Sequence, residues 1–463
     1  MSTKTDIQKT EDAPKLHAGL TQRQISMMGL GGAIGAGLFV GSGQAISIAG
    51  PAVLLSYLIA GTVVIVIMSM LAEMVAADPS SGAFSTFAHK AMGSSTGSTV
   101  GWLYWIQLVV VIAAEATGAA AIVAAWFPNF PQWAWVLGFV VLFTGANLLG
   151  VGNYGKFEFW FAFIKVAAIV AFLAVGALVL LGIIPTDEPV GLANLAAHGG
   201  FAPAGLTGIA AALLIVIFSF GGTEVVSIAA AESDDPQGNI KRTIKSVMMR
   251  IMFFYLGSVI VIVAVLPWNN PAIVDGPFSA VLGVLNVPGV ELVMSAVVVI
   301  ALLSAMNANI YGASRMLYSL GTRKMAPRAV THVTGKGVPA NAVLGSVAFS
   351  FIAVGLNWIW PDAVMPILLN VVGSTIIVIW CFIALTQYIL RRRAEREGTH
   401  LPLKLWGFPY LSLATIAMMV VIVGIAMTDA VARTQLLLTL GLTAALWLVS
   451  KALRLGAAPQ HQR

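Results

Sequence analysis

The sequence has little of what a soluble enzyme or a disulfide-stabilised secreted protein needs. It contains one cysteine, Cys381, in 463 residues, so no disulfide can form within the chain. Only 10% of its residues are charged. It shows no Cys/His cluster, no nucleotide-binding glycine loop and no nucleophile elbow with partner residues. These absences exclude a disulfide framework and argue against an enzyme.

Apolar residues are abundant instead. They make up 59% of the chain, and the mean hydropathy is +0.91. A helix needs about 20 apolar residues to cross a hydrocarbon core of about 30 Å. The first apolar segment is too long for a signal peptide and lacks an A-x-A cleavage site, so we expect it to be retained. The pattern predicts an all-α polytopic membrane protein with twelve spans, near residues 25–48, 52–77, 98–125, 133–149, 157–182, 207–231, 246–267, 290–319, 340–360, 363–390, 405–428 and 434–453.

The placement of positive charge predicts the orientation of these spans. With the N-terminus inside, 23 of the 25 Lys and Arg residues fall in cytoplasmic tails, loops and span ends, leaving Arg433 outside and Lys165 within a span. The positive-inside rule therefore predicts that both termini are cytoplasmic. The net charge of +6 reflects this topology and not nucleic-acid binding. The longest external segments, 183–206 and 268–289, are too short for a soluble domain, so we expect the function to lie in the helix bundle.

Two spans contain glycine-rich interruptions. Seven glycines lie between Met28 and Gln44, and residues 35–37 lie about 15–18 Å from the cytoplasmic edge at about 1.5 Å per residue. Residues 219–222 lie about 18–23 Å from the outer edge of the sixth span. Because the spans are five apart and run in opposite directions, they indicate an inverted repeat with its binding site at the midplane. The predicted divisions are a tail at 1–24, repeats at 25–182 and 207–390, two terminal helices at 405–453 and a tail at 454–463.

An unwound helix offers two kinds of polar group. Its free N–H groups favour a carboxylate, and its free C=O groups favour an ammonium. A zwitterionic amino acid needs both. Close packing of helices through small residues explains either glycine group alone. The matched depth and opposite direction of the two groups favour a binding site over that alternative.

Several motifs resemble a known family. The stretches "MMGLGGAIGAGLFVGSG", "AGPAVLLSYLIAG", "SSGAFSTFAHKAMG", "GWLYW", "NYGKFEFWFAFIKV", "FSFGGTEVVSIAAAESDDP" and "SRMLYSLG" resemble bacterial amino-acid permeases of the amino acid–polyamine–organocation superfamily, amino acid transporter family. The likeness covers residues 20–455 and is greatest to 4-aminobutyrate and aromatic amino-acid permeases. It implies a five-plus-five inverted repeat with two terminal helices, the inner membrane, and proton-coupled uptake with no cofactor beyond the proton gradient.

The resemblance also implies roles for residues at the two interruptions. Backbone N–H groups of Gly35, Ala36 and Gly37 would hold the substrate carboxylate. Carbonyl groups around Ser219 and Phe220 would take the amine, and Phe220 would close over it. The predicted substrate-binding residues are Ile34, Gly35, Ala36, Gly37, Ser219, Phe220, Gly221 and Gly222.

Three ionisable residues within spans are candidates for proton coupling. Lys165 lies about 12 Å from the cytoplasmic edge of span 5, where a lysine costs about 2.5–3.5 kcal/mol to insert. Snorkelling to the interface is the alternative, and the resemblance favours the proton role. Glu115 in span 3 is a candidate for either pocket lining and proton relay or structural pairing. For Glu224, after the second interruption, a hydrogen-bonding role at the helix break is favoured over proton transfer.

The residues expected around the substrate side chain are small or apolar. No arginine lies within a span away from its cytoplasmic end, where it could neutralise a second carboxylate, so we expect a neutral substrate, either 4-aminobutyrate or an aromatic or aliphatic amino acid. An exchanger or a facilitator with the same site is the alternative mechanism. No metal site is expected, because acidic residues in the loop after span 6 are better explained as a solvated face or an inner gate. The partners expected are therefore the amino acid, protons and lipid, while the oligomeric state stays open.

Overall fold

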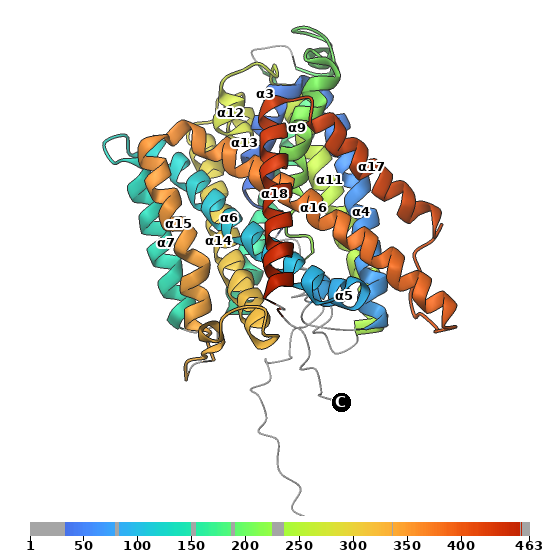
Figure 1. Cartoon of the computed structure of the whole chain (residues 1–463). Helices are drawn as coiled ribbons and strands as arrows, with labels where there is room; N and C mark the ends of the chain where they lie inside the picture. The colour runs from blue at the N-terminus through green and yellow to red at the C-terminus, as the bar shows by residue number, and fades with distance from the viewer. Residues whose placement is uncertain are drawn as a thin grey trace, which may run out of the picture.

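The computed structural model describes residues 33–78, 83–149, 154–186, 190–224, 236–335, 337–453 and 455. In this part of the chain all regular elements are helices (Figure 1). The predicted tails 1–24 and 454–463 lie outside the described residues, apart from residue 455. The elements are α2 (Ala36–Phe39), α3 (Gly41–Ala49), η1 (Gly50–Ala52), α4 (Val53–Ala77), α5 (Ala83–Met92), α6 (Ser94–Trp126), α7 (Gln132–Leu149), α8 (Tyr154–Leu180), η2 (Leu192–Leu195), α9 (Gly205–Ser219), α11 (Pro236–Val265), α12 (Ala272–Asp275), α13 (Pro277–Gly283), α14 (Val290–Thr322), η3 (Arg328–Thr331), α15 (Ala340–Ile359), α16 (Pro361–Arg396), α17 (Tyr410–Ala426) and α18 (Ala430–Ala452).

Nine helical stretches within the described residues are long and apolar enough to cross a membrane. A helix suits the hydrocarbon core of a membrane because it satisfies its own backbone hydrogen bonds where no water is present. One of the nine, Ala36–Ala77, covers residues 36–48 of the first predicted span and the whole of the second, and Gly50 interrupts it with a φ of 62°. The predicted spans 207–231 and 405–428 correspond to the shorter apolar helices Gly205–Ser219 and Tyr410–Ala426. The later part of span 207–231 extends beyond the described residues.

The helices divide into a central and a peripheral group. In α6 and in α16, 78% of the most apolar window is buried inside the protein, whereas in α18 the share is 17%. Figure 1 shows α7 and α15 along one side of the bundle and α17 along the other. Exposed side chains on the peripheral helices, such as Phe351, Val420 and Leu438, are apolar and suit contact with lipid tails. The buried core is therefore organised around α6, which carries Glu115.

Two helical segments were not expected from the hydropathy pattern. Helix α5 lies between the second and third predicted spans, and α16 continues to Arg396 although its apolar run was predicted to end at residue 390. The extension is held by Arg391, whose guanidinium forms a buried ion pair with Glu73 at 3.1 Å. Gln387 also donates to Glu73, at 3.0 Å. Hydropathy detects the membrane-crossing part of a helix and not a polar continuation stabilised by such tertiary contacts.

Candidate functional site

The first interruption is a break in the helical backbone. Ile34 and Gly35 are not helical, and α2 begins directly after them at Ala36. Tyr255 of α11 donates its hydroxyl hydrogen to the carbonyl of Ala33 at 2.6 Å. A break frees backbone groups that need new partners in an apolar interior, and Tyr255 satisfies one of them. Tyr255 was missed by the sequence analysis, because residues on distant helices show their contacts only after folding.

The second interruption follows α9. The helix ends at Ser219, and residues 220–224 form turns. Gly222 has a φ of 88°, in the left-handed region that favours glycine. Its N–H donates to Glu224 Oε2 at 2.9 Å, and the indole N–H of Trp380 donates to Glu224 Oε1 at 2.7 Å. The buried carboxylate of Glu224 therefore closes the break locally and links it to α16.

The two breaks contact each other directly. The hydroxyl of Ser219 donates to the carbonyl of Gly37 at 2.6 Å. A Cβ atom on Gly37 would lie 2.5 Å from the Cα atom of Ser219. Gly37 is therefore needed for close approach between the two backbones. The family resemblance implies a different role, in which the Gly37 N–H helps to hold the substrate carboxylate.

Glu115 occupies the backbone donor of the first break. The N–H of Ala36 donates to both carboxylate oxygens of Glu115, each at 3.0 Å. The fit is tight, since a Cβ atom on Gly35 would lie 3.0 Å from Glu115 Cδ. This N–H belongs to the group predicted to hold the substrate carboxylate. The site thus already binds a carboxylate, supplied by the protein itself.

Lys165 is close enough to Glu115 to act on it. Its side chain is fully buried, and an electrostatic interaction links it to the Glu115 carboxylate. It lies on α8, which packs against α11 and α14. Burial of the whole side chain argues against the snorkelling alternative, which requires the ammonium to reach the interface.

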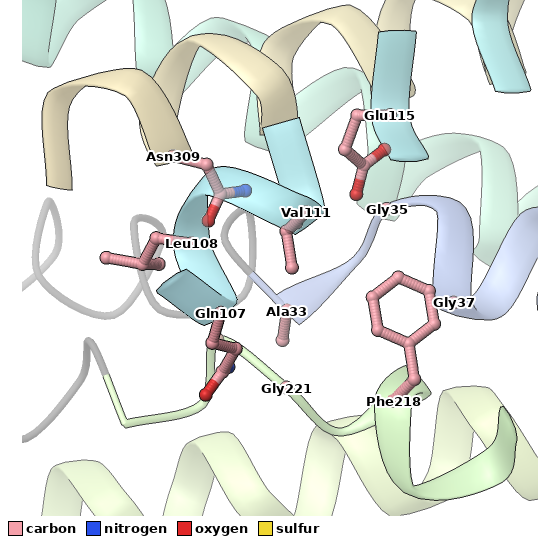
Figure 2. A pocket seen from close by; sticks show the side chains of 11 residues that line it. Ala33, Gly35, Gly37, Gln107, Leu108, Val111, Glu115, Phe218, Gly221 and Asn309 are labelled. Carbon is pink, nitrogen blue, oxygen red and sulfur yellow. The ribbon is translucent and has the colours of Figure 1, made fainter. Parts of the chain in front are cut away.

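Phe220 lies away from the space between the breaks. It is fully buried, with its ring centroid 5.2 Å from that of Tyr255 and 6.1 Å from that of Tyr57. Phe218, two residues earlier, faces the cavity instead (Figure 2). Closure of Phe220 over a substrate would need it to leave this aromatic cluster, and it stays a prediction.

A small cavity lies between the two breaks, α6 and α14 (Figure 2). Its volume of about 20 Å³ has room for roughly one water molecule. Binding of an amino acid therefore requires the lining groups to move apart. Of the eight predicted substrate-binding residues, four line the cavity: Gly35, Gly37, Gly221 and Gly222. The other four do not: Ile34, Ala36, Ser219 and Phe220. The remaining lining residues are Ala33, Gln107, Leu108, Val111, Glu115, Phe218 and Asn309.

Other polar residues within the spans are divided between the cavity and helix packing. Asn309 lines the cavity and donates to the carbonyl of Ala305 at 2.8 Å. Asn307 instead accepts a hydrogen bond from Asn147 on α7 at 2.8 Å, which is an interhelical contact. No group of three or more potential metal ligands occurs in the part of the chain that the structure describes. The acidic loop residues Glu232, Asp234 and Asp235 lie outside it.

Comparisons with known proteins agree on the family. The family model described as amino acid permease matches residues 24–452. The chain is 45% identical over 424 residues to the aromatic amino acid transport protein of Corynebacterium glutamicum, covering 91% of both chains. It is 43% identical over 422 residues to the gamma-aminobutyric acid permease of Bacillus subtilis, covering 91% of this chain and 90% of the relative. The gamma-aminobutyric acid permease of Escherichia coli is 44% identical over 399 residues, 86% of each chain.

A solved structure shares the fold. The crystal structure of a mutant manganese transporter from Eremococcus coleocola superposes with a TM-score of 0.58 and covers 97% of both chains. The sequence identity is 14%, so the likeness concerns the fold alone. The expected polytopic helical fold is thereby confirmed.

Proposed function

Because the chain belongs to the amino acid permease family, we propose that it is a proton-coupled symporter. It imports a neutral amino acid across the inner membrane of a bacterium. The observation that carries the proposal is the Ala36 N–H, which donates to both carboxylate oxygens of Glu115 beside the second break. A donor that holds one carboxylate has the chemistry to hold another.

The proposed topology has twelve spans in two inverted five-helix repeats, followed by two terminal helices. In this arrangement α2 and α3 belong to the first broken span and α9 to the sixth. The hydrogen bond between Ser219 and Gly37 supports their pairing as corresponding elements. The distribution of Lys and Arg supports cytoplasmic termini.

In the proposed binding mode, the substrate carboxylate displaces Glu115 from the first break. The backbone N–H groups of Gly35, Ala36 and Gly37 then bind that carboxylate. Carbonyl groups near Ser219 and Phe220 bind the amine. The exchange of one carboxylate for another keeps the buried donors satisfied at each stage, which avoids the penalty of about 1–3 kcal/mol for an orphaned group.

Proton coupling follows from the same exchange. An ionised Glu115 is a strong acceptor for the Ala36 N–H, and a protonated Glu115 is a weaker one. Protonation therefore favours release of the donor to the substrate. Lys165 also acts electrostatically on this carboxylate, so we assign the proton to the interacting pair of Glu115 and Lys165. Glu224 is given a positioning role, because it accepts hydrogen bonds from Gly222 within its own break and from Trp380.

The proposed substrates are neutral amino acids. The relatives named above are described as transporting aromatic amino acids or gamma-aminobutyric acid, and both are neutral overall. Glu115, which lines the cavity, already interacts with Lys165. A second substrate carboxylate would lose its hydration without gaining a cation, so acidic amino acids should be poor substrates.

Reconstituted proteoliposomes test the mechanism. With an imposed pH gradient, alkaline inside, we expect accumulation of a labelled neutral amino acid above equilibrium, abolished by a protonophore. Accumulation that needs preloaded unlabelled substrate and ignores the pH gradient would identify an exchanger. Equilibration without accumulation would identify a facilitator. Strong competition by glutamate or aspartate, with none by neutral amino acids, would overturn the substrate class.

A further inference from the structure

Gln107 presents an unused polar group to the cavity. Its side chain is 2% exposed and lines the same cavity as Glu115. Among the residues that the structure describes, none forms a hydrogen bond with its amide. Neither amide atom is one of the fully buried polar atoms that lack a partner, so the amide is accessible from the cavity, where a ligand can bind it. The other amide in the cavity, that of Asn309, already donates to the Ala305 carbonyl.

Gln107 and Glu115 mark opposite ends of one face of α6. Residues 107, 111 and 115 are spaced four apart, so they lie on the same side of the helix. The helix rises about 12 Å over eight residues. Figure 2 shows Glu115 beside Gly35 at one end and Gln107 beside Gly221 at the other, with Val111 between them. The Gln107 amide therefore lies well away from the proposed carboxylate position at Ala36.

The length of the substrate distinguishes 4-aminobutyrate from an aromatic amino acid as a partner for Gln107. In 4-aminobutyrate the amine lies about 5 Å from the carboxyl carbon when bonds are about 1.5 Å long. The tyrosine hydroxyl lies about 8 Å from its carboxyl carbon by the same reckoning. The longer molecule spans more of the distance from Ala36 to Gln107. The side chains of Leu108, Val111 and Phe218 supply apolar surface for an aromatic ring on the way.

We propose that Gln107 is a specificity-determining residue that hydrogen-bonds the distal polar group of an aromatic amino acid. The substrate class is an aromatic α-amino acid with a hydrogen-bonding group far from its carboxylate, such as tyrosine. This inference rests on the proposed function and deepens it. A ring without that group leaves the Gln107 amide unpaired, and the transporter therefore disfavours it.

Competition by tyrosine and phenylalanine tests the inference, because the two differ by one hydroxyl. Uptake of one labelled aromatic amino acid is measured in proteoliposomes with the wild type and with Gln107→Leu. We expect tyrosine to inhibit about tenfold more strongly than phenylalanine in the wild type. In Gln107→Leu the ratio should fall to about one, because neither ring then meets an amide.

A matched control separates this effect from general loss of packing. Gln132→Leu removes a glutamine amide that donates to Asn357 at 2.8 Å, away from the cavity. It should leave the tyrosine-to-phenylalanine ratio unchanged. If Gln107→Leu is not folded, Gln107→Met replaces it, and binding to purified protein is followed by the shift in melting temperature.

Each outcome has one meaning. A ratio near one in the wild type, or a ratio that Gln107→Leu or Gln107→Met leaves unchanged, overturns the role of Gln107. Stronger inhibition by 4-aminobutyrate than by any aromatic amino acid overturns the aromatic class. In both cases amino acids still compete. If no amino acid competes, it is the proposed function that fails.

Discussion

The two broken helices are closed in different ways. At the first break, the carboxylate that binds the backbone comes from another helix, since Glu115 is 79 residues from Ala36 in sequence. At the second, Glu224 lies two residues from Gly222 and is further held by Trp380. Both carboxylates are buried. The first break is therefore closed by a carboxylate from another element, and the second by a carboxylate from its own turn.

This difference separates a contact that can serve as a switch from one that supports the fold. A contact between two elements is lost when they move apart, and it can be replaced by a ligand that offers the same group. A local contact moves with its own segment and keeps its geometry. On this basis Glu115 is expected to control binding, and Glu224 to control the integrity of the break. Four sets of substitutions test the distinction.

The largest effect is expected where the two breaks touch. Gly37→Leu should abolish substrate binding, because even a Cβ atom there would lie 2.5 Å from Ser219 Cα and drive the breaks apart. Gly222→Leu should do the same by straining a backbone at φ 88°. Binding is measured by isothermal titration on purified protein. Gly145→Leu on α7, where a Cβ atom meets nothing within 4 Å, is the tolerated control. Unchanged affinity in either break variant would refute the paired-break site.

Loss of the buried cation should affect coupling more than binding. Lys165→Ala should reduce uptake driven by a pH gradient to simple equilibration, because the titrating partner of Glu115 is gone. Affinity should fall by less than about tenfold, since Lys165 does not line the cavity. Paired measurements of accumulation and binding separate the two effects. Accumulation with normal pH dependence in this variant would leave Glu115 as the proton carrier.

These residues also show how far sequence reasoning extends. Glycine content and depth located both breaks, and hydropathy located the helices, because both signals are periodic or local along the chain. Depth gives height in the membrane but not direction around the helix axis. The family resemblance implied that Phe220 closes over the substrate, whereas in the structure Phe220 packs on Tyr57 and Tyr255 and Phe218 faces the cavity.

The remaining features of the site depend on contacts between distant helices. The bonds from Ala36 to Glu115 and from Trp380 to Glu224 join residues 79 and 156 positions apart. No local pattern in one sequence specifies them. Gln107 is an intermediate case. It lies two helical turns before Glu115 on the same face, so a search at helical spacing from Glu115 would have found it.

A smaller effect is expected when the charge at the first break is removed without changing its shape. Glu115→Gln has a neutral amide that binds the Ala36 N–H more weakly than a carboxylate does. Wild-type affinity should fall as the pH rises, because ionisation of Glu115 strengthens its competition with the substrate carboxylate. The variant should keep its affinity across the same pH range. Titrations at several pH values measure this. A wild-type affinity that is independent of pH, or a variant that retains the wild-type dependence, would contradict the switch.

The same substitution at the second break should give the smallest effect on transport and the opposite pattern. In Glu224→Gln, one amide oxygen can still accept from Trp380, but the amide nitrogen would face the N–H of Gly222 and leave that donor unsatisfied. We expect a destabilisation of about 1–3 kcal/mol, seen as a lower melting temperature in detergent. Trp380→Phe removes the indole donor to this carboxylate and should lower the melting temperature similarly. Binding in both variants should keep the wild-type pH dependence, because Glu115 is untouched. If Glu224→Gln instead abolishes the pH dependence at unchanged stability, the proton role belongs to the local carboxylate, and the proposed contrast between the two breaks is wrong.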